Sequence, residues 1–147
     1  MSASDTTFTR SSVMASFAQS LLAAATAAAA AGGFRMSFAV VDECGMPKAF
    51  VRMDMASFTS GHVAQDKAFT AASGRPTSVW HEALANDAVL EAGARHTIPR
   101  MTTLPGGFPI EIDGLVVGGF GVSGGHYSDD TAVALAALKE VGSRYEW

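Results

Sequence analysis

Lys67 is the residue whose type and spacing first indicate chemistry. In a helix predicted over residues 57–73, it lies at helical spacing from Ala64 and Ala71, on the small-residue face that we expect to pack. Its stem could lie on apolar surface while its ammonium pairs with an acid, of which Asp54 is the nearest preceding one outside the helix. Alternatively, the ammonium could face a pocket, where it would hold a carboxylate or act as an acid or base.

His126 is the histidine that we expect to lie nearest to a site. It follows a Gly-Gly pair at a predicted strand-to-helix junction, where functional residues often lie. Together with Lys67 and Asp54, His126 would provide the acid/base and anion-binding groups of a small enzyme. These three residues are therefore the candidate catalytic residues.

The other histidines give weaker signals. His62 and Asp66 are four residues apart on one helix, so they form either a surface pair or an acid/base pair. No paired-histidine spacing occurs, so we expect no dedicated metal site. Cys44 is the only cysteine, which excludes an internal disulfide and a cysteine-based zinc site.

Glycine-rich segments lie on either side of the last predicted strands. Residues 119–124 match G-x-G-x-x-G, but one helix and the end of the sequence follow, without the second parallel strand of a dinucleotide fold. Ser123 lacks the downstream acid-then-histidine order of a serine hydrolase. We therefore expect the glycines to let the backbone approach a neighbouring subunit or a flat ligand closely.

Composition limits the class of protein. The 147 residues are 48% hydrophobic and 16% charged, which predicts one domain over residues 1–147 with a real core. The net charge of −4 and the lack of a basic stretch argue against nucleic acid as a partner. The low charge predicts a homo-oligomer, because much of the surface needs covering.

The alanine-rich start of the chain predicts a long amphipathic helix over residues 9–31, ended by Gly32-Gly33. The same segment imitates an export signal, with Arg10 upstream of an apolar run. The run is too short to span a bilayer, and its alanines suit packing. We therefore favour a structural helix and a cytoplasmic protein without membrane association.

The remaining pattern predicts an α+β domain in two or three layers. Strands are expected over 34–42 and 48–53, which form a hairpin, and over 110–112 and 115–122, joined by Asp113-Gly114. Residues 101–104 predict a weaker strand. Further helices are expected over 57–73, 77–86 with an added turn or two over 87–93, and 128–145. The hairpins make the sheet largely antiparallel.

An ordered set of segments resembles the GlcG/HbpS family over almost the whole chain. The segments are VVDECG (40–45), RMDMA (52–56), AQDKAFTA (64–71), GGFPI (106–110) and GGFGVSGG (118–125). The resemblance implies an α/β sandwich with a five-stranded, mainly antiparallel sheet flanked by helices, including long N-terminal and C-terminal ones. It also implies dimers or larger rings, haem or another tetrapyrrole as ligand in some members, and a place among bacterial catabolic pathways.

The resemblance fails at one position and leaves two functions open. Haem-binding relatives carry a ligating histidine on the first helix, and residues 9–31 contain none. The retained lysine and glycine loops imply a pocket, for which the predicted ligand-binding residues are His62, Gly106, Gly107, Phe108, Gly124 and Gly125. The chain is then a binding module for a small, flat molecule such as haem. The alternative is a small isomerase, lyase or hydrolase for a carboxylated or aromatic metabolite, with the three candidate catalytic residues.

Overall fold

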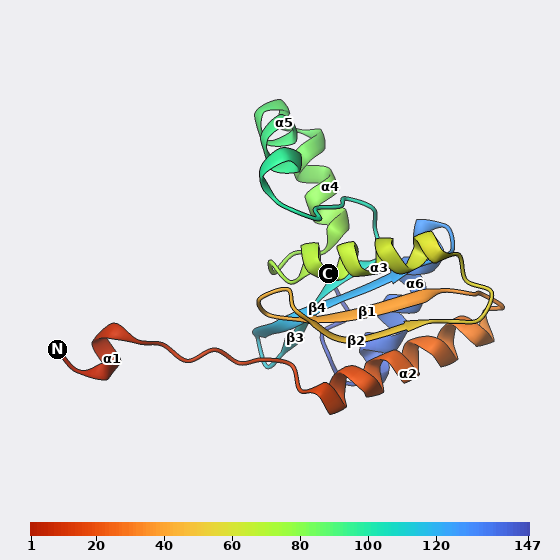
Figure 1. Ribbon diagram of the computed structural model, residues 1–147, viewed down its shortest axis with the longest axis horizontal. Coiled ribbons are helices and arrows are strands. Elements are labelled where there is room, and N and C mark those ends of the chain that lie inside the picture. The colour runs from red at the N-terminus through yellow and green to blue at the C-terminus, as the bar shows by residue number, and fades with distance from the viewer.

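The structure is a computed structural model that describes residues 1–147. A single sheet separates helices on its two faces, with α3 on one face and α2 and α6 on the other (Figure 1). The helices are α1 (Ala3–Thr6), α2 (Ala15–Ala31), α3 (Phe58–Ala71), α4 (Thr77–Ala85), α5 (Ala88–Thr97) and α6 (Tyr127–Glu140). The chain is therefore a three-layer α+β domain, as the sequence pattern predicts.

The sheet is built from two antiparallel hairpins. Its strands are β1 (Ser37–Asp42), β2 (Pro47–Arg52), β3 (Gly107–Ile112) and β4 (Leu115–Ser123), in the spatial order β2-β1-β4-β3. The Asp113-Gly114 turn joins β3 to β4 as predicted, with both residues at positive φ. All three pairings are antiparallel, so β2 and β3 are the edge strands.

The main core lies between the sheet and helices α2 and α6. Alternating strand residues point large apolar side chains to this side, and Phe38, Phe120 and Ile110 are fully buried there. Small side chains such as Ala25 of α2 and Ala134 of α6 complete the layer. The buried alanine stripe of α2 thus has the packing role that its sequence predicts.

On the opposite face of the sheet, glycines of β4 and Ala39 of β1 let α3 lie directly on the backbone. A Cβ atom at Gly121 would stand 2.6 Å from the Ala68 nitrogen, and one at Gly119 would stand 2.7 Å from the Ala72 nitrogen. Ser57 caps α3 as predicted, its hydroxyl accepting from the Ser60 N–H at 3.2 Å. This close approach requires glycine in β4.

An ion pair between Lys67 and Asp130 joins α3 to α6, two helices on opposite faces of the sheet. The Lys67 Nζ donates to Asp130 Oδ2 at 2.8 Å and to the Val122 carbonyl at 2.7 Å. Asp130 Oδ1 accepts from the Gly125 N–H at 2.9 Å. Burial lowers the pKa of Lys67 and raises the pKa of Asp130, while their mutual attraction opposes both shifts.

The sheet has four strands, not five, because residues 101–104 form no strand. The Thr102 N–H donates to Thr70 Oγ1 at 3.0 Å, and the Thr103 hydroxyl accepts from Arg95 Nη2 at 3.2 Å. Side chains of α3 and α5 therefore satisfy polar groups of this segment, and the prediction of a strand there is wrong.

The first long helix begins at Ala15 rather than at Thr9. The Val13 N–H donates to the Val117 carbonyl at 2.9 Å, and the Val13 side chain is buried in the main core. Residues 7–14, here called the N-terminal strap, run without helical structure beside the start of β4, and the short α1 precedes them (Figure 1). Pairing with β4 keeps Val13 out of the helix.

The last helix ends at Glu140 rather than at Tyr145. Gly142 has a φ of +76°, and the Ser143 N–H bonds back to the Leu138 carbonyl at 3.0 Å. A glycine in the left-handed region followed by such a bond is a common helix stop. The C-terminal helix therefore ends more than one turn earlier than predicted.

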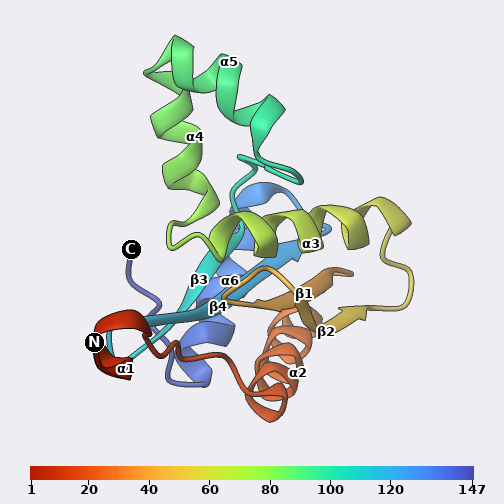
Figure 2. The same cartoon turned by 60° about the vertical axis from the view of Figure 1, so that its left-hand side comes forward.

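Helices α4 and α5 form an arm that projects away from the sheet beyond α3 (Figure 2). Asp87 caps α5, accepting from the Leu90 N–H at 2.9 Å, and the helix continues to Thr97, past the predicted end. No helix in the structure has both the length and the apolar character needed to cross a bilayer.

We predict that Gly121→Ala destabilises the protein by about 3 kcal/mol or more, because the added Cβ would meet the backbone of α3. Denaturant unfolding measures the loss. Gly93→Ala is the matched control: nothing lies within 4 Å of a Cβ there, so the change should raise helix stability by up to about 1 kcal/mol. Equal small effects of the two changes would contradict the close contact.

We predict that Lys67→Met costs about 3 kcal/mol at about pH 8, because it leaves the Asp130 carboxylate buried without its cation. The pKa of Asp130, already raised by burial, should rise further without Lys67. A carboxyl group with a raised folded-state pKa contributes stability at low pH that is lost as the pH rises. The cost should therefore be smaller at about pH 5.

Thermal and urea unfolding of Lys67→Met and of the wild type at both pH values measures this dependence. Lys139→Met removes an exposed lysine from α6 and should change stability by less than about 0.5 kcal/mol at either pH. A Lys67→Met variant as stable as the wild type at about pH 8 would show that the ion pair does not hold the two helices.

Candidate functional site

The three candidate catalytic residues do not line a common cavity. Lys67 is 1% exposed and its ammonium bonds to Asp130 and Val122, so the expected pairing with Asp54 is wrong. Asp54 is exposed in the loop between β2 and α3. His126 is exposed at the start of α6. Catalytic roles for these residues remain predictions, now without a shared pocket.

The histidines near the predicted site have structural partners or none. His126 is the N-cap of α6, where its Nδ1 accepts from the Ser128 N–H at 3.2 Å. His62 is exposed on α3, and the carboxylate of Asp66 bonds to Arg100 Nε at 2.9 Å instead of to His62. Nowhere do three or more potential metal-ligating side chains gather.

Other parts of the chain pack closely against the glycine loops. A Cβ at Gly106 would stand 2.9 Å from Lys67 Nζ, and one at Gly107 would stand 2.6 Å from the Lys67 carbonyl. Gly124 approaches the Met36 backbone, where a Cβ would stand 2.8 Å from Cα. Phe108 is buried in the main core. These residues position α3 and α6, while Gly124 and Gly125 are exposed just before the start of α6. A ligand-binding role for these residues remains a prediction.

Open apolar space lies instead between α2 and the edge strand β2. Two adjoining cavities of about 810 and 530 Å³ share Thr26, Ala30 and Val51, and together we call them the α2–β2 groove. The first is lined mainly by apolar residues, seven of ten. Its other lining residues are Gln19, Leu22, Ala23, Ala27, Lys48, Ala49 and Phe50.

Charged groups accompany this apolar surface. Lys48 lines the first cavity, and Arg35, Arg52 and Asp54 line the second. None of the three cations forms an ion pair, because the four ion pairs of the chain involve other residues. Arg52 Nη1 donates to the Ala56 carbonyl at 2.6 Å, leaving other donors free. The groove therefore combines an apolar wall with an excess of positive charge, three unpaired cations against one carboxylate.

The groove contains one sulfur ligand for a soft metal and one carboxylate, Asp54. Met53 lines the second cavity with its thioether, and no histidine or cysteine lines either cavity. The chemistry that this surface offers is therefore contact with a flat apolar body and attraction of carboxylates. Coordination by imidazole is not available from these lining residues.

Sequence reasoning missed the groove because its lining residues are ordinary when taken one by one. The alanines of α2 predict packing, but they occupy both faces of the helix, and only those pointing away from the core line the groove. The available signal was Ala23, Ala27 and Ala30, which share one side of the helix opposite the buried stripe. The sequence did not predict that β2 would lie beside these alanines of α2.

Comparison with known proteins identifies the family. The family model described as haem degrading protein HbpS-like matches residues 14–139. Protein GlcG of Escherichia coli K12 is 35% identical over 106 residues, which are 72% of this chain and 77% of that protein.

Two solved structures share the fold. A double mutant of Streptomyces reticuli HbpS has a TM-score of 0.81 and 32% identity, covering 92% of this chain and 90% of that one. The PduOC:heme complex has a TM-score of 0.84 and 25% identity, covering 92% and 99% respectively. With the family model spanning most of the sequence, the chain belongs to the HbpS-like family.

Proposed function

We propose that this chain binds a flat, apolar ligand with carboxylate groups, such as haem or another tetrapyrrole, in the α2–β2 groove. The observation that carries this proposal is the apolar wall of the groove together with the unpaired cations Lys48, Arg35 and Arg52. The apolar wall would cover the macrocycle, and the cations would attract its carboxylates. The cavity volumes lie in the range of small-molecule sites.

The relatives support this class of ligand. The family model is described as haem degrading, and one structural neighbour was solved as a haem complex. The first long helix of this chain, α2, carries no histidine. The groove residues fit a macrocycle and its carboxylates, whereas for iron they offer the Met53 thioether and the Asp54 carboxylate but no imidazole. Recognition should therefore depend on the ring and its charges more than on the metal.

We predict that haem and metal-free protoporphyrin IX bind with affinities within about tenfold of each other, because most contacts are to the ring. Absorbance and fluorescence titrations measure both affinities. Ala27→Glu, which places a carboxylate on the groove wall, should weaken both by about tenfold or more. Ala132→Glu, an exposed alanine of α6, is the matched control and should change neither.

Three results would contradict the proposal. The first would be that neither porphyrin binds at micromolar concentration, and the second that Ala27→Glu and Ala132→Glu have equal effects on binding. Alternatively, substituting His62, His81, His96 or His126 singly abolishes haem binding, which would place the ligand at a histidine outside the groove.

We also propose that the chain assembles as a homo-oligomer. Large apolar side chains remain exposed along β2, the loop after it and the start of α3: Phe50 is 47% exposed, Met55 89% and Phe58 73%. Apolar groups gathered in one region of a monomer surface mark interaction sites. The outer edge of β2 is also unpaired, which adds backbone groups available to a second copy.

We predict that light scattering at micromolar concentration gives a mass of at least two chains. Phe58→Asp should shift the distribution toward the monomer, because it places a charge in the apolar contact. Phe8→Asp changes a similarly exposed phenylalanine outside this region and should leave the mass unchanged. A monomeric wild type would refute the assembly.

A further inference from the structure

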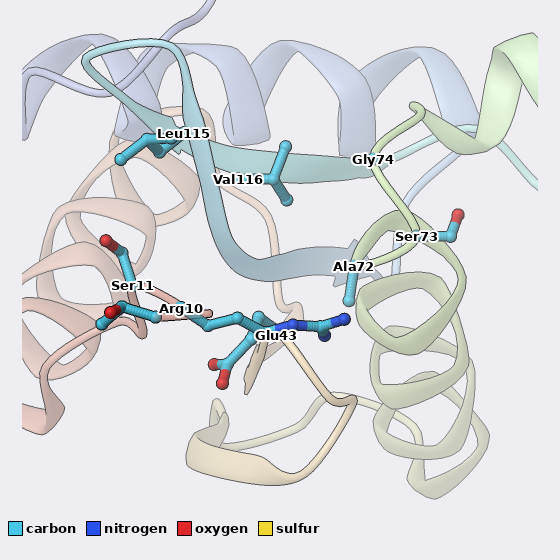
Figure 3. Close-up of a pocket in the computed structure, with 9 residues that line it drawn as sticks. Arg10, Ser11, Glu43, Ala72, Ser73, Gly74, Leu115 and Val116 are labelled. Carbon is cyan, nitrogen blue, oxygen red and sulfur yellow. The ribbon is translucent and has the colours of Figure 1, made fainter. Parts of the chain in front are cut away.

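A separate cavity of about 350 Å³ lies beneath the N-terminal strap, at the end of α3 (Figure 3). It shares no lining residue with the α2–β2 groove. The strap, the turn between β1 and β2, the end of α3 and the hairpin between β3 and β4 all contribute to it. Its lining residues are Thr9, Arg10, Ser11, Glu43, Ala72, Ser73, Gly74, Leu115 and Val116.

Glu43 brings an unsatisfied carboxylate oxygen to this cavity. Its Oε2 atom is buried and has no hydrogen-bond partner, the one such side-chain atom in the structure. The turn that carries it is well held, because Asp42 Oδ1 accepts from the N–H groups of Cys44 at 2.9 Å and Met46 at 3.0 Å. A buried carboxylate oxygen without a donor is costly, so this position favours a ligand that donates, such as an ammonium group.

Arg10 brings an uncompensated positive charge to the same cavity. It forms no ion pair and no hydrogen bond with its guanidinium, which lies 5.2 Å from the centre of the Phe8 ring. Figure 3 shows the Arg10 side chain reaching across the cavity toward Ala72, while the Glu43 carboxylate points to another side. The strap is anchored close by, at Val13. The N–H donors of the Arg10 guanidinium suit a carboxylate.

We propose that this cavity binds a small zwitterion, a short aliphatic molecule with a protonated amine and a carboxylate. The amine would donate to Glu43, and the carboxylate would accept from Arg10 and the strap hydroxyls of Thr9 and Ser11. Ala72, Leu115 and Val116 would contact the aliphatic part. A molecule with one charge would leave either Glu43 or Arg10 uncompensated. Thr9, Arg10 and Ser11 precede the residues that the family model matches, 14–139, so three of the nine lining residues, the cation among them, belong to the strap.

The test uses β-alanine as the probe, with glycine and 4-aminobutyrate as shorter and longer zwitterions. Propionate and ethylamine each carry one of its two charges. Amide chemical shifts of the full chain, followed by NMR during titration, give the affinity and the place of binding. We expect β-alanine or one of its length variants to shift signals around Glu43 and Ser73 at about 10 mM or less, and propionate and ethylamine to bind at least about tenfold more weakly.

Two variants separate binding from folding. Glu43→Gln and Arg10→Met should each weaken zwitterion binding by about tenfold or more, while Glu82→Gln and Lys139→Met, exposed and outside the cavity, should not. Without ligand, Glu43→Gln should raise the melting temperature, because it removes a half-buried carboxylate whose buried Oε2 atom lacks a partner. A lowered melting temperature would mean that Glu43 serves the fold.

The proposal is overturned if none of the three zwitterions shifts these signals at about 10 mM, or if Glu43→Gln and Arg10→Met both leave the affinity unchanged. It is also overturned if ethylamine or propionate binds as tightly as the best zwitterion. Porphyrin binding in the α2–β2 groove is measured separately, so the two sites can fail independently.

Discussion

The contact between α3 and the glycines of β4 is the constraint on which the rest of the structure depends. At Gly119 and Gly121 the helix backbone takes the place that side chains would occupy, so this face of the sheet has no thick apolar layer. The largest buried apolar side chains of the strands, Phe38, Phe120 and Ile110, pack on the other face, against α2 and α6. The two faces of one sheet thus have different thickness, and the alternation of residue size along β4 produces the difference.

The same closeness explains why Lys67 is buried. Because α3 lies so near the sheet, its lysine extends past the end of β4 and meets Asp130 of α6, with Gly106 making room beside the ammonium. A buried ion pair of this kind adds little net stability over an apolar pair, but either charge alone would be costly. The pair therefore specifies how the two helices are placed. The glycine loops at Gly106 and Gly125 contact this ion pair.

Because α3 covers one face of the sheet directly, the two cavities that we propose as binding sites lie at the margins of the sheet. The α2–β2 groove forms because β2 is an edge strand and the outward alanines of α2 are too short to cover it. The cavity beneath the strap forms where chain segments from four parts of the sequence meet without filling the space. Both surfaces hold charges that the fold leaves unpaired, and unpaired charge at a cavity is a reason to look for a ligand.

The sequence by itself determined the family, the helix cap at Ser57, the hairpin turn and the four strands. Caps such as Ser57, the Asp113-Gly114 turn and the strand patterns depend on interactions between residues close in the chain, so they are readable without the fold. Only the tertiary structure decided that Asp130, 63 residues away, is the partner of Lys67 and not Asp54. It also decided that residues 101–104 bond to side chains of α3 and α5, and that Val13 pairs with β4 instead of joining a helix. The physical reason is common to all three: each depends on which distant polar group or strand end lies within bonding distance, and local propensity does not contain that information.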